Sequence, residues 1–416
     1  MGKLCDNLVS DIKSKQKLPM SCIVETVLSS MSSINKPQRI FMAYLFSVLM
    51  VFQGRATYTN MSRYSQLSQR RYYRWSKKHF DYADFNTQLL LAVFPLESER
   101  IAAIDASFIS KSGKHTQGLG YFYNGSAGEA QRGLEISTIS VTDLASNTAY
   151  ALDSRQTIDE KNKTRIDLYA EHLIDLVSKL HQLGVRYLSC DAYYTKIKFV
   201  QAGVNAGVEL IGKLRIDARL HWLYDGEYSG IGRPKKFDGR VKIDTDLARF
   251  TPHGKLDNNV EVYDAVVYSS SLKRNIKLVL LKFNKGNRMG QALFYSTDTD
   301  LNAMTLVRYY KARFQIEFLF RDAKQHTGLT HCQSLRKEAI NMQVNASLTA
   351  LNLLKIEDRQ SKNTSGETVI SIASWKRRKF NQHLMDRLFD ELGLDLNNEK
   401  VATVYEQFSD YGAIAA

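Results

Sequence analysis

Residues 310–324 read Tyr310-Lys-Ala-Arg313-Phe-Gln-Ile-Glu317-Phe-Leu-Phe-Arg-Asp-Ala-Lys324. Each residue of an α-helix turns by roughly 100°. If this stretch is one helix, Tyr310, Arg313, Glu317 and Lys324 fall within about 60° of one another. One helical stripe would then present a phenol, a guanidinium, a carboxylate and an ammonium group. We expect such a stripe to hold a divalent cation beside a phosphate.

Two aspartates end short apolar runs earlier in the chain. Asp105 follows residues 101–104, Ile-Ala-Ala-Ile, and Asp191 follows residues 185–190, Val-Arg-Tyr-Leu-Ser-Cys. Chemistry at a phosphodiester develops charge on the attacking and leaving oxygens, which two metal ions roughly 4 Å apart stabilise together. Mg²⁺ prefers carboxylate oxygens as ligands. We therefore expect Asp105 to bridge two Mg²⁺ ions, for which Mn²⁺ would substitute, while Asp191 and Glu317 each hold one.

Each of these residues also has an ordinary interpretation. An aspartate after a strand is often a turn or cap residue, and Arg313 with Glu317 is a common ion pair between neighbouring turns of a surface helix. The combination of four residue types at fixed spacing is what favours a functional site.

The composition limits the class of protein. The chain has 416 residues, enough for two or three domains, and a formal net charge of +14, which favours an anionic polymer as partner. A basic protein without such a partner remains the alternative. The four cysteines are scattered without metal-binding spacing, as suits a reducing cytosol. The longest apolar run, residues 41–52, is too short to cross a bilayer, so no membrane association is expected.

The order of predicted elements divides the chain into five segments. Strands at 100–109, 133–142 and 148–153, a helix at 165–183, a strand ending at Asp191, a helix at 195–202 and a strand at 208–214 predict a mixed α/β sheet layered with helices. Strands at 241–243, 260–269 and 275–283 predict a β-rich insertion. The predicted segments are a helical DNA-binding domain (1–95), the first part of an α/β catalytic core (96–215), the insertion (216–290), the end of the core with the Glu317 helix (291–330) and a C-terminal helical region (331–416).

Two short predicted helices in the first segment, at 61–66 and 69–80, are similar to a helix-turn-helix. Arg70, Arg71, Arg74 and Lys77 lie on the second helix, interleaved with aromatic residues. Basic side chains contact phosphates and guanine edges, while aromatic side chains anchor such a helix on its core. The alternative is a solvated basic helix in a bundle.

The motifs together resemble one known family. Tyr310, Arg313, Glu317 and Lys324 match the Y-(2)-R-(3)-E-(6)-K signature of DDE transposases of the insertion-sequence-four family. The sequences that begin at Asp105 (Asp-Ala-Ser-Phe) and at Cys190 (Cys-Asp-Ala-Tyr-Tyr) are similar to that family's first and second aspartate motifs. The similarity covers roughly residues 40–356, including a β-rich insertion before the glutamate helix.

The resemblance implies a ribonuclease H-like fold, a five-stranded mixed sheet flanked by helices, with Asp105, Asp191 and Glu317 as metal ligands. It implies an enzyme that binds the inverted repeats of an insertion sequence, cleaves a strand with water and joins the freed 3′-OH to target DNA. The implied partner is double-stranded DNA, both transposon ends and target, bound by a homodimer in a synaptic complex. The implied location is the prokaryotic cytoplasm, at the nucleoid.

Further residues are expected to contact DNA. Trp222, in the insertion, would stack a flipped base, although packing in a β core is an equal alternative. The remaining expected contacts, with transposon-end phosphates or backbone, are Tyr310, Arg313, Lys324, Lys213 and Arg215.

Two other functions remain open. A ribonuclease H-like nuclease that hydrolyses DNA without strand transfer would use the same three carboxylates. A catalytically inactive DNA-binding protein descended from a transposase would not need them, so their presence counts against it.

Overall fold

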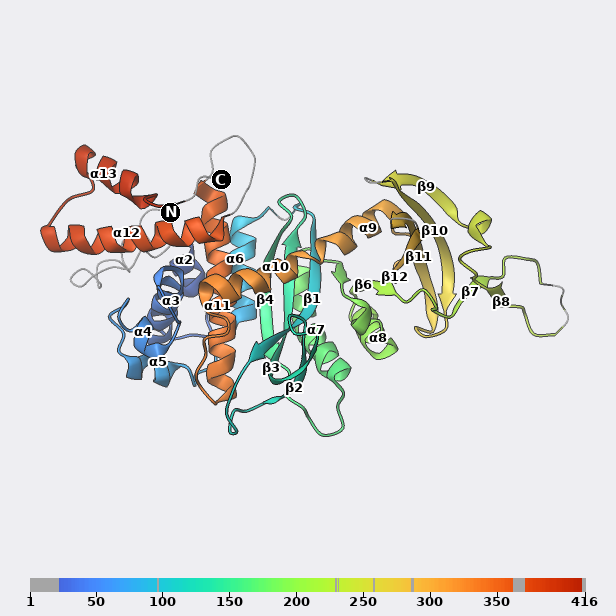
Figure 1. Ribbon diagram of the computed structural model, residues 1–416, viewed down its shortest axis with the longest axis horizontal. Helices are drawn as coiled ribbons and strands as arrows, with labels where there is room; N and C mark the ends of the chain where they lie inside the picture. Colours follow the sequence, from blue (N-terminus) through green and yellow to red (C-terminus); the bar gives the residue numbers. More distant parts are fainter. Residues whose placement is uncertain are drawn as a thin grey trace.

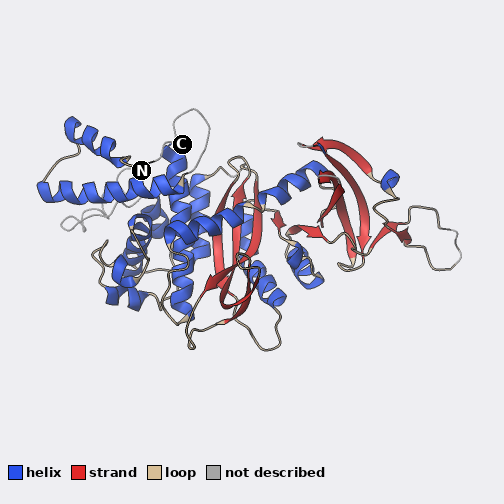
Figure 2. Cartoon of the chain, in the orientation of Figure 1, coloured by secondary structure: helices blue, strands red, loops and turns tan. Residues whose placement is uncertain are grey.

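The computed structural model describes residues 22–95, 97–228, 230, 232–256, 259–285, 288–361 and 371–413. Helices and one large mixed sheet make up this part of the chain, so the fold belongs to the mixed α/β class, as expected (Figure 2). The parts of the first and last predicted segments at 1–21, 362–370 and 414–416 lie outside the described residues. Among the described residues, no helix combines the length and apolar character that crossing a bilayer requires.

The N-terminal helices are built around α3 (Lys36–Val51), which is apolar and largely buried. The Asn35 side chain accepts a hydrogen bond from the Gln38 amide at 3.0 Å and Pro37 lies in the first turn, so both fix where α3 begins. Residues of α3 belong to the same hydrophobic cluster as the central strands, so the helices and the sheet share one core. The other helices here are α2 (Cys22–Ser30), α4 (Tyr58–Met61), α5 (Gln69–Trp75) and α6 (Tyr82–Val93).

The two short helices α4 and α5 differ in extent from the prediction. Helix α4 spans residues 58–61, so it ends where the predicted helix began. It starts early because the Thr57 hydroxyl accepts a hydrogen bond from the Asn60 amide and caps the first turn. The second ends at Trp75, because the Ser76 hydroxyl bonds to the Tyr73 carbonyl and closes its last turn. Aromatic contacts from α5 to α3 hold the pair in place.

The sheet is centred on β1 (Arg100–Ser110). On one side β3 (Glu129–Asp143) runs antiparallel to β1, and β4 (Thr148–Gln156) pairs with β3. On the other side β5 (Tyr187–Ser189) and then β6 (Glu209–Leu214) run parallel to β1. Five strands therefore adjoin in the order β4-β3-β1-β5-β6. Figure 1 shows α7 (Arg165–Gln182) and α8 (Ile197–Asn205) on one side of them, and α6 and α11 (Lys337–Ser361) on the other.

Helix α11 covers the edge of β4 that faces away from β3. The Asn345 side chain accepts from the Ser154 amide at 2.9 Å and donates to the Ser154 carbonyl at 2.8 Å. Asn352, two turns later, makes the same pair of bonds with Ala151 at 2.9 and 2.8 Å. Side-chain amides thus satisfy backbone groups that an exposed edge strand would leave open. Helix α11, which we assigned to the C-terminal segment, therefore packs on the core.

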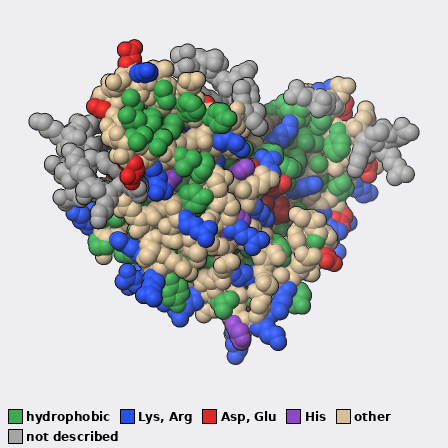
Figure 3. Space-filling view, turned by 60° about the vertical axis from the view of Figure 1, so that its left-hand side comes forward, with side chains coloured by type: hydrophobic (Ala, Val, Ile, Leu, Met, Phe, Trp, Pro, Cys, Tyr) green, Lys and Arg blue, Asp and Glu red, His purple; other side chains and the backbone are tan. Residues whose placement is uncertain are grey.

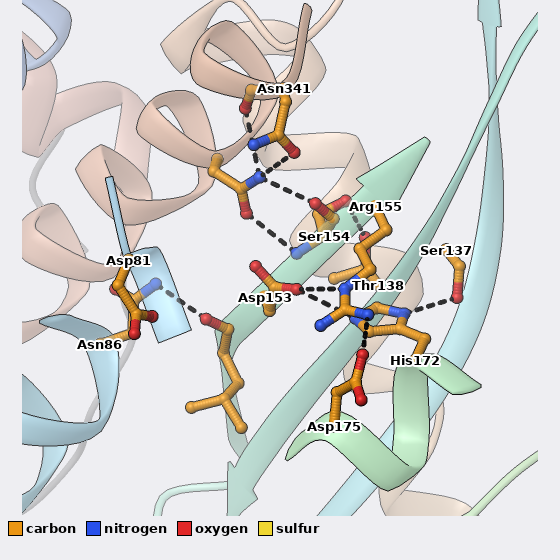
Figure 4. Close-up of polar contacts among 12 residues, drawn as sticks. Asp81, Asn86, Ser137, Thr138, Asp153, Ser154, Arg155, His172, Asp175 and Asn341 are labelled. Carbon is orange, nitrogen blue, oxygen red and sulfur yellow. Dashed lines mark hydrogen bonds and ion pairs between the residues drawn. The ribbon is translucent and has the colours of Figure 1, made fainter. Parts of the chain in front are cut away.

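A buried polar network fastens α7 to the sheet (Figure 4). The His172 Nδ1 lies 3.0 Å from the Ser137 Oγ, and its Nε2 lies 3.2 Å from the Asp153 carboxylate. Arg155 connects Asp153 to Asp175 at 3.1 and 2.6 Å. Serine, histidine and aspartate are within hydrogen-bond reach here, but Ser137 and His172 are buried, so the hydroxyl is closed to substrate. Burial also lowers the pKa of His172, which keeps the ring neutral within a structural network.

The sheet continues beyond β6 into the insertion, which differs from the separate five-stranded sheet that we expected. β12 (Arg288–Ser296) pairs antiparallel with β6, because the open edge of β6 offers backbone hydrogen-bonding groups to it. The described residues therefore form one 12-stranded sheet. Ten strands follow the order β2-β3-β1-β5-β6-β12-β11-β10-β7-β8, while β4 pairs with β3 and β9 pairs with β10 beside this path. The strands not yet given are β2 (Gly120–Asn124), β7 (Leu220–Leu223), β8 (Phe237–Arg240), β9 (Thr251–Leu256), β10 (Val260–Ser269) and β11 (Arg274–Lys285).

One predicted strand of the insertion, at 241–243, is not formed. Val241 and Ile243 are buried in the core of the insertion, but the chain there has left β8 and turns toward Asp246. Burial alone produced the strand-like pattern. After α11 the described chain ends in α12 (Ile372–Leu392) and α13 (Glu399–Ser409).

Candidate active site

The predicted single helix around Glu317 is three consecutive helical segments. These are α9 (Ala303–Ala312), α10 (Gln315–Asp322) and the π-helical segment η5 (Ala323–Thr327). Between α9 and α10 the amides bond to carbonyls three residues back, so the backbone is tighter there and wider in η5. The predicted stripe across all four signature residues is therefore wrong, because the helical register changes twice along it.

Arg313 lies between two of the three expected carboxylates. Its Nη2 is 2.9 Å from the Glu317 Oε1, and its Nη1 is 3.6 Å from the Asp105 Oδ2. Arg313 is buried, and the neighbouring Tyr310 ring stacks on Phe294 of β12 at 4.2 Å between centroids. The Arg313–Glu317 pair that we also considered as an ordinary surface pair is thus half-buried and aimed at Asp105.

Asp105 lies within β1, and Asp191 follows the end of β5, the parallel strand beside it. β1 and β5 pair Ala102 with Leu188 and Ala103 with Ser189. Continuing this register by two residues places Asp105 level with Asp191. The Asp191 Oδ1 also accepts a hydrogen bond from the Tyr193 amide at 2.8 Å and caps the short 3₁₀ helix η2 (Ala192–Tyr194). The cap interpretation of Asp191 is therefore correct, and the same side chain stands at the strand end beside Asp105.

The electrostatics of Asp105 connect all three carboxylates. The pKa of Asp105 is raised to about 7, mainly by burial and also by the charges of Asp191 and Glu317. The Ala106 amide and the Arg313 guanidinium act in the opposite direction. A site in which carboxylates oppose one another's ionisation is one that a bound cation stabilises.

The donor chemistry of this site fits a hard divalent cation, because all three groups are carboxylates. Within the described part of the chain, however, no group of three or more His, Cys, Asp or Glu side chains is close enough together to hold a metal ion. Arg313 takes up the position beside Asp105 and Glu317. The guanidinium therefore serves as the internal cation in this arrangement, and metal binding requires it to release at least one carboxylate.

A comparison with protein families covers the same part of the molecule. The family model described as "Transposase DDE domain" matches residues 97–353, more than half of the chain and all three carboxylates. The chain belongs to the transposase DDE domain family. Transposases of this family generally use divalent metal ions. No curated protein matches the chain in a sequence search.

The sequence did not predict a row of exposed side chains along α10 of this transposase. The exposed residues are Phe314 (50%), Phe318 (42%), Glu317 and Arg321, spaced as one face of a helix. The Arg313 guanidinium lies 5.0 Å from the Phe314 ring centroid, and the Arg321 guanidinium 4.8 Å from that of Phe318. Two exposed phenylalanines beside a half-exposed glutamate were a signal in the sequence, but only with the helix register known.

Lys324 lies in η5 and is not part of the Arg313–Glu317 contact. Burial lowers its pKa, and no described carboxylate pairs with it. The structure therefore joins Tyr310, Arg313 and Glu317 of the signature and leaves Lys324 apart from them.

Three of the predicted recognition residues, Arg70, Arg71 and Arg74, lie on α5, and Lys77 follows its end; α5 lies beside α3 and apart from β1 (Figure 1). Arg70, Arg74 and Lys77 are exposed, and Arg71 is half-buried. The Lys77 ammonium lies 4.1 Å from the Tyr73 ring centroid. None of the four forms an ion pair with a described carboxylate, so their charges face solvent.

The other expected DNA contacts, Lys213, Arg215 and Trp222, differ in exposure and in their partners. Lys213 is exposed in β6, whereas Arg215 is already paired with Asp217 at 2.8 and 2.9 Å. Trp222 is 5% exposed, its Nε1 donates to Asp246 at 2.8 Å, and the Arg249 guanidinium covers its ring at 4.3 Å. Of the two interpretations of Trp222, packing in a β core is therefore correct. Stacking of a flipped base stays a prediction, and it would require Arg249 and the surrounding core to uncover the ring.

Proposed function

We propose that this transposase binds the inverted repeats of an insertion sequence, cleaves the DNA in a Mg²⁺-dependent reaction and joins the freed 3′-OH to target DNA. The proposal is supported by the contacts of Arg313 with both Asp105 and Glu317, and by the parallel pairing of β1 with β5, whose end Asp191 follows. Membership of the transposase DDE domain family supports the reaction class.

The proposed reaction has two steps, hydrolysis of one strand and transfer of the freed 3′-OH. A water oxygen forms a bond to phosphorus as the bond to the strand's 3′-oxygen breaks, which leaves a 3′-OH and a 5′-phosphate. The 3′-OH then attacks a target phosphodiester, so one bond to phosphorus forms as one breaks, with no covalent enzyme intermediate. Two divalent ions held by Asp105, Asp191 and Glu317 would stabilise the charge on the attacking and leaving oxygens.

The chain's own residues position the DNA in this proposal. When Arg313 leaves Glu317, its guanidinium fork can bind two oxygens of a phosphate. Tyr310 holds Arg313 in place, because its ring is fixed on Phe294 and the guanidinium lies 5.8 Å from its centroid. Lys324, without a carboxylate partner, and the exposed Phe314 and Phe318 extend the surface that meets the strand.

Two finer assignments belong to the same proposal. The order β4-β3-β1-β5-β6, with antiparallel pairing up to β1 and parallel pairing after it, supports a ribonuclease H-like core. The contacts among Tyr310, Arg313 and Glu317 support membership of the insertion-sequence-four group. The exposed cations of α5 support recognition of the repeats, and the proposed place of action is a prokaryotic nucleoid.

A homodimer on DNA is also proposed. Figure 3 shows apolar side chains gathered on the upper part of the face where α12 and α13 come forward, while lysine and arginine side chains are spread below. Exposed apolar side chains at this density mark an interaction surface. They are Leu384, Leu388, Leu392, Leu394, Leu396, Val404 and Phe408.

The experiment is a cleavage and strand-transfer assay on a duplex that carries the element's own ends, with Mg²⁺ and a target plasmid. We expect Asp105→Asn, Asp191→Asn and Glu317→Gln each to abolish cleavage while the duplex is still shifted on a gel. Glu338→Gln, at an exposed position of α11, is the matched control and should cleave normally. Near-normal cleavage by any of the three variants would refute that residue's metal role.

The products separate the candidate functions. A joined product supports transposition, nicked DNA without joining indicates a hydrolytic nuclease, and a gel shift without cleavage by the unaltered chain indicates an inactive DNA-binding protein.

A further inference from the structure

A cavity of ≈ 420 Å³ lies where α12 meets the end of α3 and the π-helical segment η5. The basic side chains that line it are Lys376 and Arg377 of α12 and His326 of η5, and the phenol of Tyr411 lines it as well. No acidic side chain among the described residues lines it. Arg377, together with Lys376 when it is protonated, therefore gives the cavity a positive charge, and the cavity belongs neither to the carboxylate site nor to α5.

Lys376 is the unusual member of this lining. Only 9% of the residue is exposed, its Nζ donates to the backbone carbonyl of His326, and the same nitrogen lies 3.6 Å from the Phe52 ring centroid. Burial alone lowers the pKa of Lys376 to about 7, because no described carboxylate is near enough to raise it. One turn away, Lys379 has Glu357 as its partner. A buried ammonium without a counter-charge is unfavourable unless an anion accompanies it.

The rest of the cavity wall is fixed around this cation. Arg377 is exposed at the rim and forms no ion pair among the described residues. Asn381 donates to the Ser409 and Tyr411 carbonyls at 3.0 and 2.9 Å, which holds the turn after α13 over the cavity. Hydrogen bonds thus hold α12 and the segment after α13 together around the cavity, which Lys376 and Arg377 of α12 line.

We propose that this cavity is a phosphate-binding site in which Lys376 and Arg377 supply the positive charge. An ammonium and a guanidinium match the charge of one phosphate group, which accepts several charge-assisted hydrogen bonds. A cavity of this size admits a phosphate with its water or a mononucleotide. The group is either a free phosphate compound or a backbone phosphate of bound DNA, and both share this chemistry.

Occupancy of the site has a structural consequence. η5 continues directly from α10, which carries Glu317, and Lys376 bonds to its backbone at His326. An anion on Lys376 therefore holds α12 on the segment that follows the catalytic helix. The inference goes beyond the proposed function, because it concerns a second site and does not depend on cleavage.

The test is calorimetric titration of the full chain with inorganic phosphate, at constant ionic strength with chloride as the reference anion. We expect saturable binding that Lys376→Met weakens by about tenfold or more and Arg377→Gln by several-fold. Met keeps the length of the lysine side chain and removes a buried charge, and position 377 is exposed, so at least the second variant should fold. Arg387→Gln, at an exposed position on the same helix outside the cavity, is the matched control and should bind phosphate normally.

A second arm identifies the source of the phosphate group. If a 20-base-pair duplex displaces the bound phosphate, and Lys376→Met lowers the affinity of the chain for that duplex, the site takes a DNA backbone phosphate. If duplex and phosphate bind together, the site takes a free phosphate compound. Glu317→Gln should bind phosphate as the unaltered chain does, so a failure of cleavage leaves this inference untouched. The inference would be overturned if the chain bound phosphate no better than chloride. It would also be overturned if Lys376→Met and Arg377→Gln both bound phosphate as tightly as the unaltered chain.

Discussion

The Arg313 guanidinium lies 3.6 Å from the Asp105 carboxylate, measured from Nη1 to Oδ2. This contact makes the arginine part of the carboxylate site instead of a neighbour of it. The second arm of Arg313 is bonded to Glu317, so a divalent ion held by these carboxylates would compete with the arginine for them. In the proposed reaction, Arg313 would then be released to meet a phosphate.

The pH dependence of stability should report on Asp105. Its pKa in the folded chain is about 7, above the roughly 3.9 expected when unfolded, so the folded state binds more protons between these values. The free energy of unfolding therefore falls as pH rises from about 4 to 7. Without metal, we expect Asp105→Asn to be more stable than the unaltered chain at pH 8 by about 2 kcal/mol, with little difference at pH 4. Urea unfolding in EDTA measures this.

Added Mg²⁺ completes this experiment. The ion should stabilise the unaltered chain at pH 8 more than it stabilises Asp105→Asn, because a ligand stabilises only the state that binds it. Asp300→Asn, at an exposed position, is the control. An Asp105→Asn variant with the same pH profile and the same response to Mg²⁺ would show that Asp105 is not a buried ligand.

Recognition by α5 can be tested through salt. Arg74 is exposed, has no described ion-pair partner and is available to a DNA phosphate. We expect Arg74→Ala to weaken binding of the end duplex and to reduce the slope of log affinity against log salt by about 1. Lys400→Ala, on α13, should leave both unchanged. Equal affinity of Arg74→Ala at every salt concentration would exclude α5 as the recognition helix.

The packing of Trp222 gives a prediction about stability. Trp222→Phe loses the hydrogen bond from Nε1 to Asp246, so we expect the free energy of unfolding to fall by about 1–2 kcal/mol. Cleavage by the folded variant should be normal. Thermal unfolding and the cleavage assay measure the two effects. Unchanged stability together with lost binding of DNA ends would instead restore the base-stacking interpretation.

The buried ring of His383 predicts sensitivity to acid. Burial lowers its pKa to about 4, and neither ring nitrogen has a hydrogen-bond partner. The folded chain therefore favours the neutral ring, and this contribution to stability is present above about pH 6.5 and lost as pH falls toward 4. We expect His383→Phe to gain stability over the unaltered chain at pH 5 relative to pH 7.5. Melting temperatures at the two pH values measure it, and equal changes at both would contradict the assignment.

The order of apolar and polar residues along the chain predicted those helices and strands that are buried on one face or on all sides. The strand at 260–269 was predicted with the bounds of β10. Asp105 was expected where an apolar run ends, but β1 continues past it to Ser110. The pairing of β6 with β12 was not predictable, because it joins strands about 80 residues apart through backbone groups that every residue has. The same holds for the edge of β4, which Asn345 and Asn352 cover from a distant helix.

The roles of the site residues stay predictions, whereas the single uninterrupted helix expected around Glu317 is not formed. A helical wheel assumes one register, and the chain changes register between Arg313 and Phe314 and again after Asp322. The partner of Trp222, Asp246, lies in another part of the insertion, so no local pattern distinguishes a buried indole from an exposed one. The Lys376 cavity likewise depends on three distant segments.

The hydrogen-bond ladder between β6 and β12 makes the insertion an extension of the catalytic strands and not a lobe on a hinge. Two continuous connections run from β10 and β11 toward the acidic groups. One passes through β12 and β6 to β5, whose last residue precedes Asp191 by two positions, and the other passes through α9, which packs on these strands and leads into the helix of Glu317. A shift of the outer strands would therefore reach both Asp191 and Glu317.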